Sequence, residues 1–135
     1  MINIIYGAKG AGKTKKIIDA ANDSLQVAKG NIVFLTDTDR YSPQINYQIR
    51  FINTKDYEIK TEMGLYGFIR GLIAGNTDIE YVYIDGAARM ANLPLEEMGG
   101  LYDMIGQLSQ KFNINFCLTV SADENDIPDF IKKYL

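Results

Sequence analysis

An eight-residue segment near the start of the chain carries glycines, a lysine and a threonine at a spacing suited to phosphate binding. Gly7-Ala8-Lys9-Gly10-Ala11-Gly12-Lys13-Thr14 matches the pattern G-x-x-x-x-G-K-[ST] in full. Glycines let consecutive backbone N–H groups turn inward around phosphate oxygens, while the lysine reaches the β- and γ-phosphates and the threonine hydroxyl helps to hold Mg²⁺. We therefore expect Gly7 to Thr14 to bind the phosphates of a nucleotide.

Asp85 is the second candidate, because it directly follows the apolar run Tyr81-Val82-Tyr83-Ile84. A carboxylate at the end of a buried strand binds Mg²⁺ in many phosphate-binding proteins of this type, so we expect Thr14 and Asp85 to be the metal-binding residues. The alternative is a strand-end carboxylate that caps the next turn. Many P-loop ATPases follow this aspartate with a glutamate that polarises the attacking water. Here that position is Gly86, so the hydrolytic set is incomplete.

Two further acidic positions and two arginines are candidates for catalysis. Asp37 and Asp39 follow the apolar run that ends at Thr36, where either would act as a base or simply lie in a solvated turn. Arg40 and Arg89 would stabilise charge on a transferred phosphoryl group or form exposed ion pairs. The residues that we select as catalytic candidates are Lys13, Asp37, Asp39 and Arg89.

Strands and helices alternate along the sequence in a way that would position these residues. Apolar runs predict strands over 2–6, 31–36, 81–84 and 115–120, with a shorter strand over 47–51. Helical spacing of apolar residues predicts helices over 13–28, 65–73 and 98–112, and a closing helix over 127–135 with Asp126 as its N-cap. Ser121, after the last strand, would sense the γ-phosphate or cap a helix.

This alternation predicts an α/β fold with three layers, in which helices cover both faces of a mostly parallel sheet. Ligands of such sheets bind beyond the carboxyl ends of the strands. The segments 7–14, 37–40, 85–89 and 121–125 all follow predicted strands. We therefore expect the candidate residues to converge at one edge of the sheet.

Composition limits the classes of function. The 135 residues, 47% hydrophobic and 23% charged, fit a single domain spanning 1–135. A net charge of −3 argues against general attraction to nucleic acid or anionic lipid. The only cysteine, Cys117, is expected to be a reduced core residue. The absence of histidine removes the usual base and metal ligand. With no signal-like or membrane-spanning segment in the sequence, we expect no membrane association and a cytoplasmic location.

At these residues the sequence resembles the type II thymidine kinases, a family of P-loop proteins with a core like that of the RecA-like ATPases. Gly7 to Thr14 matches the family's P-loop, Asp37-Thr38-Asp39-Arg40-Tyr41-Ser42 is similar to its D-x-R-Y-S segment, and Ile84 to Met90 is similar to its I-D-E-A-Q-F segment. The resemblance implies a P-loop NTPase fold with Lys13, Thr14 and Asp85 as phosphate and Mg²⁺ contacts. The family's catalytic glutamate, zinc domain and thymidine-enclosing loop have no counterpart here.

The sequence therefore predicts a Mg²⁺-dependent ATP-binding protein, with ATP and Mg²⁺ as its ligands. The first hypothesis is a weak ATPase, or one whose site is completed by a second copy of the chain or by a protein partner. The alternative is a non-hydrolytic nucleotide-binding switch that controls a partner. A kinase for nucleosides or other small molecules is the third. Adenine is expected because the chain has no N-K-x-D guanine motif.

Overall fold

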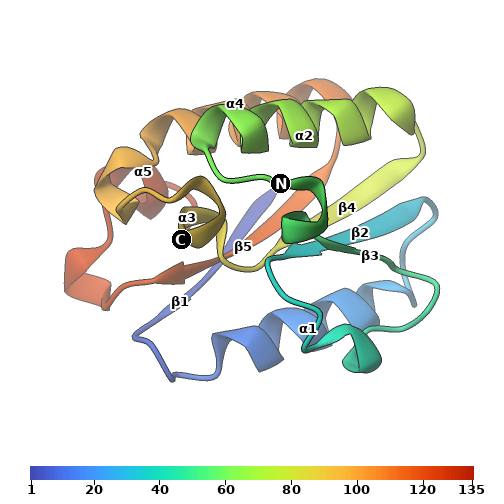
Figure 1. Ribbon diagram of the computed structural model, residues 1–135, viewed down its shortest axis with the longest axis horizontal. Coiled ribbons are helices and arrows are strands. Elements are labelled where there is room, and N and C mark those ends of the chain that lie inside the picture. The colour runs from blue at the N-terminus through green and yellow to red at the C-terminus, as the bar shows by residue number, and fades with distance from the viewer.

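The computed structural model describes residues 1–135 and contains five strands and five α-helices (Figure 1). In chain order these are β1 (Ile2–Gly7), α1 (Lys13–Ser24), β2 (Asn31–Thr36), β3 (Arg50–Asn53), α2 (Glu62–Gly75), β4 (Ile79–Ile84), α3 (Ala87–Ala91), α4 (Gly99–Phe112), β5 (Asn115–Ser121) and α5 (Asp129–Lys132). Four short 3-10 turns lie between them, at Ser42–Gln44, Thr54–Tyr57, Leu95–Glu97 and Glu124–Asp126.

The five strands form one sheet in the order β1-β5-β4-β2-β3, and every pairing is parallel. The predicted α/β fold with three layers is confirmed, and the sheet is parallel throughout rather than mostly so. Long apolar runs explain this arrangement, because a parallel sheet covered on both faces buries nearly every residue of its central strands. In β2, for example, all residues after Asn31 are buried. The architecture is compatible with a P-loop NTPase-like fold.

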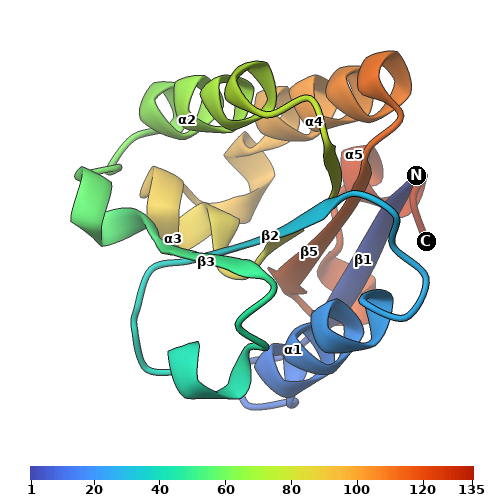
Figure 2. The same cartoon turned by 90° about the vertical axis from the view of Figure 1, so that its right-hand side faces the viewer.

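Helices cover the two faces of the sheet unequally. Figures 1 and 2 show α2 and α4 along one face and α1 alone along the other. The core on the α2 and α4 side contains 25 buried residues, whereas the core under α1 contains nine. Phe34 and Ile17 are fully buried on the α1 side, and Leu65 and Ile105 are fully buried on the other. Most of the hydrophobic stabilisation therefore comes from the α2 and α4 side.

The carboxyl ends of all five strands lie at one edge, because the strands are parallel. β1 leads into the glycine-rich loop and then into α1, while β4 leads into Asp85. β5 lies between β1 and β4, and its last residue Ser121 pairs in register with Gly7. A hydrogen bond of 3.1 Å from the Ala122 N–H to the Gly7 carbonyl ties the end of β5 to the start of the loop. The segments expected to converge therefore follow strands that end at the same edge.

Several element boundaries differ from prediction for local reasons. α1 ends at Ser24 rather than Ala28, because residues 25–27 form i to i−3 hydrogen bonds and leave the α-helical pattern. β3 is Arg50–Asn53 rather than 47–51, because Asn46 accepts from the Gln48 N–H in a turn and Tyr47 is 91% exposed. Short elements such as α3 carry too few residues to show periodicity.

The prediction that Asp126 caps the last helix is wrong. Asp126 ends the preceding 3-10 turn, and the N-cap of α5 is Pro128, with no side-chain hydrogen bond. Pro128 lacks an N–H and has the extended backbone that suits the position before a helix. No helix of the chain is both long enough and apolar enough to cross a bilayer.

Candidate functional site

The glycine-rich loop presents backbone donors at the N-terminus of α1. Gly10 and Gly12 have φ values of 87° and 82°, a left-handed conformation that side chains disfavour and glycine accepts. Gly12 is the N-cap of α1, and no side chain caps the helix. Because the first N–H groups of a helix have no partner inside it, they are left free for an anion at this end.

The charges around this helix end are unusual for a helix N-terminus. The first turn of α1 contains no acidic residue and instead carries Lys13, Lys15 and Lys16, with Lys9 in the preceding loop. Cations at the positive end of the helix dipole destabilise a helix, by up to about 1 kcal/mol each at exposed positions. Lys15 offsets part of this through an exposed pair with Asp19 at 2.8 Å. A bound anion would offset the rest.

Lys13 lies along the loop, where its ammonium donates to the Ala8 carbonyl at 2.9 Å. The same carbonyl accepts from the Ala11 N–H at 3.0 Å, which closes the turn of the loop. A lysine ammonium has three donors. Two of them remain for phosphate oxygens while the contact with Ala8 keeps the side chain against the loop.

Asp85 is the centre of a buried hydrogen-bond cluster at the ends of β4 and β5. Its carboxylate accepts from the Thr14 hydroxyl at 3.0 Å and from the Thr119 hydroxyl at 2.7 Å, one on each oxygen. Thr119 in turn accepts from the Gly86 N–H at 3.2 Å. Asp85 is only 4% exposed. The structure therefore joins Thr14 and Asp85, which the sequence predicts to share a metal ion.

Thr36 adds a buried hydroxyl with no partner beside this cluster. β2 and β4 pair through Leu35 and Ile84, so Thr36 and Asp85 are the next residues on neighbouring strands. Side chains alternate along a strand, which places Thr36 on the same face as Phe34, under α1. Thr36 is 0% exposed and its Oγ1 makes no hydrogen bond. Buried polar atoms are normally satisfied, so this hydroxyl is a further polar group that a ligand beside the cluster could contact.

These residues fit a magnesium ion that is shared with a nucleotide. No group of three or more carboxylate, histidine or cysteine side chains gathers anywhere in the chain, so the protein alone supplies few metal ligands. Magnesium commonly binds through one or two protein ligands together with waters and substrate phosphates. Thr14 and Asp85 are such a pair, and they adjoin the loop that would hold the phosphates.

A side chain at position 86 would be strained in this structure. Its φ is 93°, and a Cβ at this position would collide with the guanidinium of Arg89. Arg89 folds back over Gly86 to reach Asp37, and its Nε and Nη2 donate to the two carboxylate oxygens at 3.1 Å each. These hydrogen bonds raise the pKa of the Arg89 guanidinium above its ordinary value, against the opposing effect of partial burial. A cation therefore lies where many ATPases place a glutamate.

The ion pair changes how two candidate residues are interpreted. Both oxygens of Asp37 are engaged by Arg89, so in this structure Asp37 holds an arginine, and its predicted role as a base stays untested. Asp39 and Arg40 are exposed and form no ion pair. Ser121 is exposed at the end of β5 and donates no hydrogen bond from its side chain. The structure therefore brings together Thr14 with Asp85 and Arg89 with Asp37, but not these three residues.

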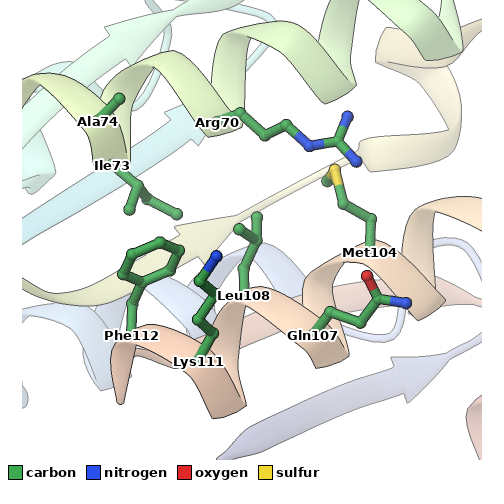
Figure 3. A pocket seen from close by; sticks show the side chains of 8 residues that line it. All are labelled: Arg70, Ile73, Ala74, Met104, Gln107, Leu108, Lys111 and Phe112. Atoms are coloured by element: carbon green, nitrogen blue, oxygen red, sulfur yellow. The ribbon is translucent and has the colours of Figure 1, made fainter.

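A groove elsewhere on the molecule contains none of the predicted site residues. It lies between α2 and α4, has a volume of about 340 Å³, and includes Met104, Leu108 and Phe112 (Figure 3). These two helices cover the face of the sheet opposite α1 (Figure 2). The groove and the glycine-rich loop are therefore on different sides of the sheet.

No protein-family model matches the chain, and no curated protein matches it. The assignment of a function therefore rests on the residues and geometry of the site.

One residue of the cluster and one beside it escape sequence reasoning. Thr119 and Thr36 each lie inside or at the end of an apolar run, where a threonine is as common as any β-branched strand residue. The only available signal is the alternation of side chains along the strand, which puts Thr119 on the same face as Cys117 and Ser121. That this face lies beside Asp85 can be predicted only once the strand order is known. Their role depends on sheet order, which sequence periodicity does not contain.

Proposed function

We propose that this protein is a P-loop NTPase with a RecA-like or thymidine-kinase-like core that binds Mg²⁺-ATP. The observation that carries the proposal is the uncapped N-terminus of α1, surrounded by lysines and hydrogen-bonded through Thr14 to the buried Asp85. A structural turn would have no need for cations at the positive end of a helix. Adenine is part of the proposal because the sequence lacks a guanine motif.

In this proposal the chain's own residues do most of the binding. The N–H groups of the loop and of the first turn donate to phosphate oxygens, and Lys13 adds a positive charge. Thr14 and Asp85 hold the magnesium ion, which would neutralise phosphate charge. Thr119 orients the Asp85 carboxylate through its hydrogen bond at 2.7 Å. Thr36 would gain a partner from the ordered water that such a site contains.

Hydrolysis in this proposal is slow, or is completed by a second copy or a protein partner. A general base must reach the attacking water. Gly86 supplies no side chain, and Asp37 is engaged by Arg89. Arg89 would stabilise negative charge on the transferred phosphoryl group. Asp39, the remaining candidate base, is exposed and forms no ion pair. The chain thus offers charge stabilisation without a base that is fixed in the cluster, as in NTPases that gain a missing residue in trans.

A phosphate-release assay over a range of protein concentrations tests this proposal. If a second copy completes the site, turnover should depend on Lys13, and the turnover rate per protein molecule should rise with protein concentration. A constant low turnover that depends on Lys13 supports slow intrinsic hydrolysis. The Lys13→Ala variant is the control for contaminating phosphatase.

The alternative function is a non-hydrolytic nucleotide switch, and the position of Arg89 over Gly86 favours it. An arginine in place of a base would hold a triphosphate without activating water. Tight ATP binding with no phosphate release at any protein concentration would support the switch and contradict the ATPase. A small-molecule kinase remains the third hypothesis, and a screen of nucleosides for ATP-dependent phosphorylation tests it.

A further inference from the structure

A cavity beside the Arg89–Asp37 pair is not used by the proposed nucleotide site. It has a volume of about 490 Å³ and lies beyond the carboxyl ends of β2 and β4. Its walls come from the segment that includes the 3-10 turn at Thr54–Tyr57 and from α3 with the residues that follow it. Clefts for small molecules commonly measure about 300 to 1,000 Å³, so the cavity has the size of a metabolite site rather than of a macromolecular interface.

The lining of the cavity carries a net positive charge after the paired charges of Arg89 and Asp37 are set aside. Lys55, Lys60 and Arg89 all line the cavity, and Asp37 and Glu58 are its carboxylates. The negative charge of Asp37 is balanced by the positive charge of Arg89, which donates two hydrogen bonds to it. Lys55 and Lys60 form no ion pair, and neither does Glu58. Two unpaired lysines against one unpaired glutamate leave the cavity with a net positive charge.

Arg89 retains donors that Asp37 does not use. Asp37 accepts from Nε and from one hydrogen of Nη2, so Nη1 has no acceptor in the protein. Guanidinium groups bind carboxylate and phosphate oxygens through pairs of parallel N–H donors. Ile59 and Met90, both buried, form the apolar part of the lining. The lining thus combines an apolar surface with cations, as sites for small anionic molecules do.

Two residues at the cavity have a left-handed backbone. Glu58 has φ 56° and ends the 3-10 turn, and Asn92 has φ 54° and ends α3. They are two of the three non-glycine residues of the chain with positive φ. A left-handed conformation is strained for a residue such as glutamate, and such strain is concentrated at ligand sites. Both residues line the cavity.

We propose that this cavity binds a small molecule that carries a phosphate monoester or a carboxylate group, held by Lys55, Lys60 and Arg89. Arg89 also lies over Gly86, next to Asp85, so it borders both the cavity and the edge where the nucleotide phosphates would lie. The anionic molecule is therefore the second ligand of the site, where it acts as an effector of the nucleotide-bound state. This last role rests on the proposed nucleotide site, whereas anion binding in the cavity does not.

Amide NMR of the ¹⁵N-labelled full chain tests the proposal, with inorganic phosphate and succinate as separate probes. Either probe should shift the amide signals of Glu58 and Asn92 saturably. Shifts with phosphate alone indicate a phosphate ligand, and shifts with succinate alone indicate a carboxylate ligand. The Lys55→Ala/Lys60→Ala double variant should weaken this binding at least about tenfold, because each lysine contributes a charge-assisted hydrogen bond.

The matched control is Lys29→Ala/Lys111→Ala, which removes two exposed lysines that do not line the cavity and should leave the binding unchanged. The proposal is overturned if neither probe shifts Glu58 and Asn92, or if the Lys55→Ala/Lys60→Ala variant binds as the wild type does with a native spectrum. The same spectra separate the two proposals, because Mg²⁺-ATP should shift Gly10 and Gly12. Shifts at the cavity without shifts at the loop would remove only the role as second ligand.

Discussion

Asp85 is the residue that most clearly links structure to chemistry in this protein. Its two oxygens accept from hydroxyls on different elements, Thr14 on α1 and Thr119 on β5. Asp85 is buried. A carboxylate is costly to bury, and hydroxyl donors offset only part of that cost. A bound cation would offset more of it. This arrangement supports the proposed metal role of Asp85.

The first prediction concerns the Asp85→Asn variant, which keeps the size of the side chain but removes its charge. Mg²⁺ should no longer strengthen ATP binding in this variant, whereas Mg²⁺ should strengthen it about tenfold or more in the wild type, since a charge-assisted contact contributes about 1.5 kcal/mol or more. Calorimetric titration of ATP with and without Mg²⁺ measures the difference. Asp56→Asn, at an exposed position outside the proposed site, is the control. An unchanged response to Mg²⁺ in Asp85→Asn would exclude the metal role.

At the scale of elements, the predicted secondary structure succeeds where a segment is long and periodic. β2, β4, β5 and α4 lie within two residues of their predicted bounds at either end, because each buries a continuous apolar run or stripe. α3 and the 3-10 turn at Thr54–Tyr57 are too short for a period to appear. These two unpredicted elements supply Lys55, Arg89 and Met90 to the cavity proposed above, and the other lining residues lie in the adjoining loops.

The turn between β4 and α3 provides the second prediction. Gly86→Ala should lower the free energy of unfolding by about 1–2 kcal/mol for the left-handed backbone alone, and by more because the new Cβ displaces Arg89. Urea unfolding measures both contributions. In an Arg89→Ala background the same substitution should cost less, since the collision is absent. Equal costs in the two backgrounds would show that Arg89 does not lie over Gly86.

α2 provides the third prediction, because it is one continuous helix although it contains several glycines, which have a low helix propensity. Gly67 has open space around the position of a Cβ, so Gly67→Ala should raise the free energy of unfolding by about 0.5–1 kcal/mol. Gly64→Ala is the comparison, since its Cβ would lie 3.2 Å from the Thr61 hydroxyl that caps the helix. Gly64→Ala should therefore gain less. A loss of stability in Gly67→Ala would indicate that this face of α2 is not free.

At the scale of the whole molecule, buried acidic groups couple stability to alkaline pH. Burial raises the pKa of the Cys117 thiol to about 12 and also raises the pKa of the Tyr102 hydroxyl. Both groups are neutral when folded, and they ionise more readily when the chain unfolds. Because the unfolded chain then binds fewer protons, this contribution to stability is complete below pH 9 and is lost as the pH rises toward 12.

The fourth prediction follows from this coupling. Cys117→Ala should destabilise the protein at pH 8, because it leaves a small cavity beneath α1. The difference from the wild type should shrink by about 1 kcal/mol at pH 10, since only the wild type loses the contribution of the thiol. Urea unfolding at the two pH values measures it. A difference that stays constant would mean that the Cys117 thiol is not protected by burial.

The whole fold also explains how much of the site is contained in the sequence. The glycine-rich loop and Asp85 are recognisable because each is a local pattern next to a strand. Thr119, Thr36 and the pairing of Arg89 with Asp37 are not, because they depend on β5 lying between β1 and β4 and on β2 lying next to β4. In these contacts the sheet order brings together pairs of residues that are separated by 34 to 71 positions in the sequence. Periodicity within one segment of the sequence cannot predict contacts over such separations.

Calorimetric titration of Mg²⁺-ATP into the wild type, Lys13→Ala and Lys16→Ala tests the central claim most directly. Both lysines lie in the first turn of α1, but only Lys13 belongs to the phosphate-binding pattern. We predict binding by the wild type, nearly equal binding by Lys16→Ala, and binding by Lys13→Ala that is weaker by about 10-fold to 100-fold, as expected for the loss of a charged hydrogen bond. The absence of heat from Mg²⁺-ATP binding in the wild type, or equal losses in both variants, would contradict the account.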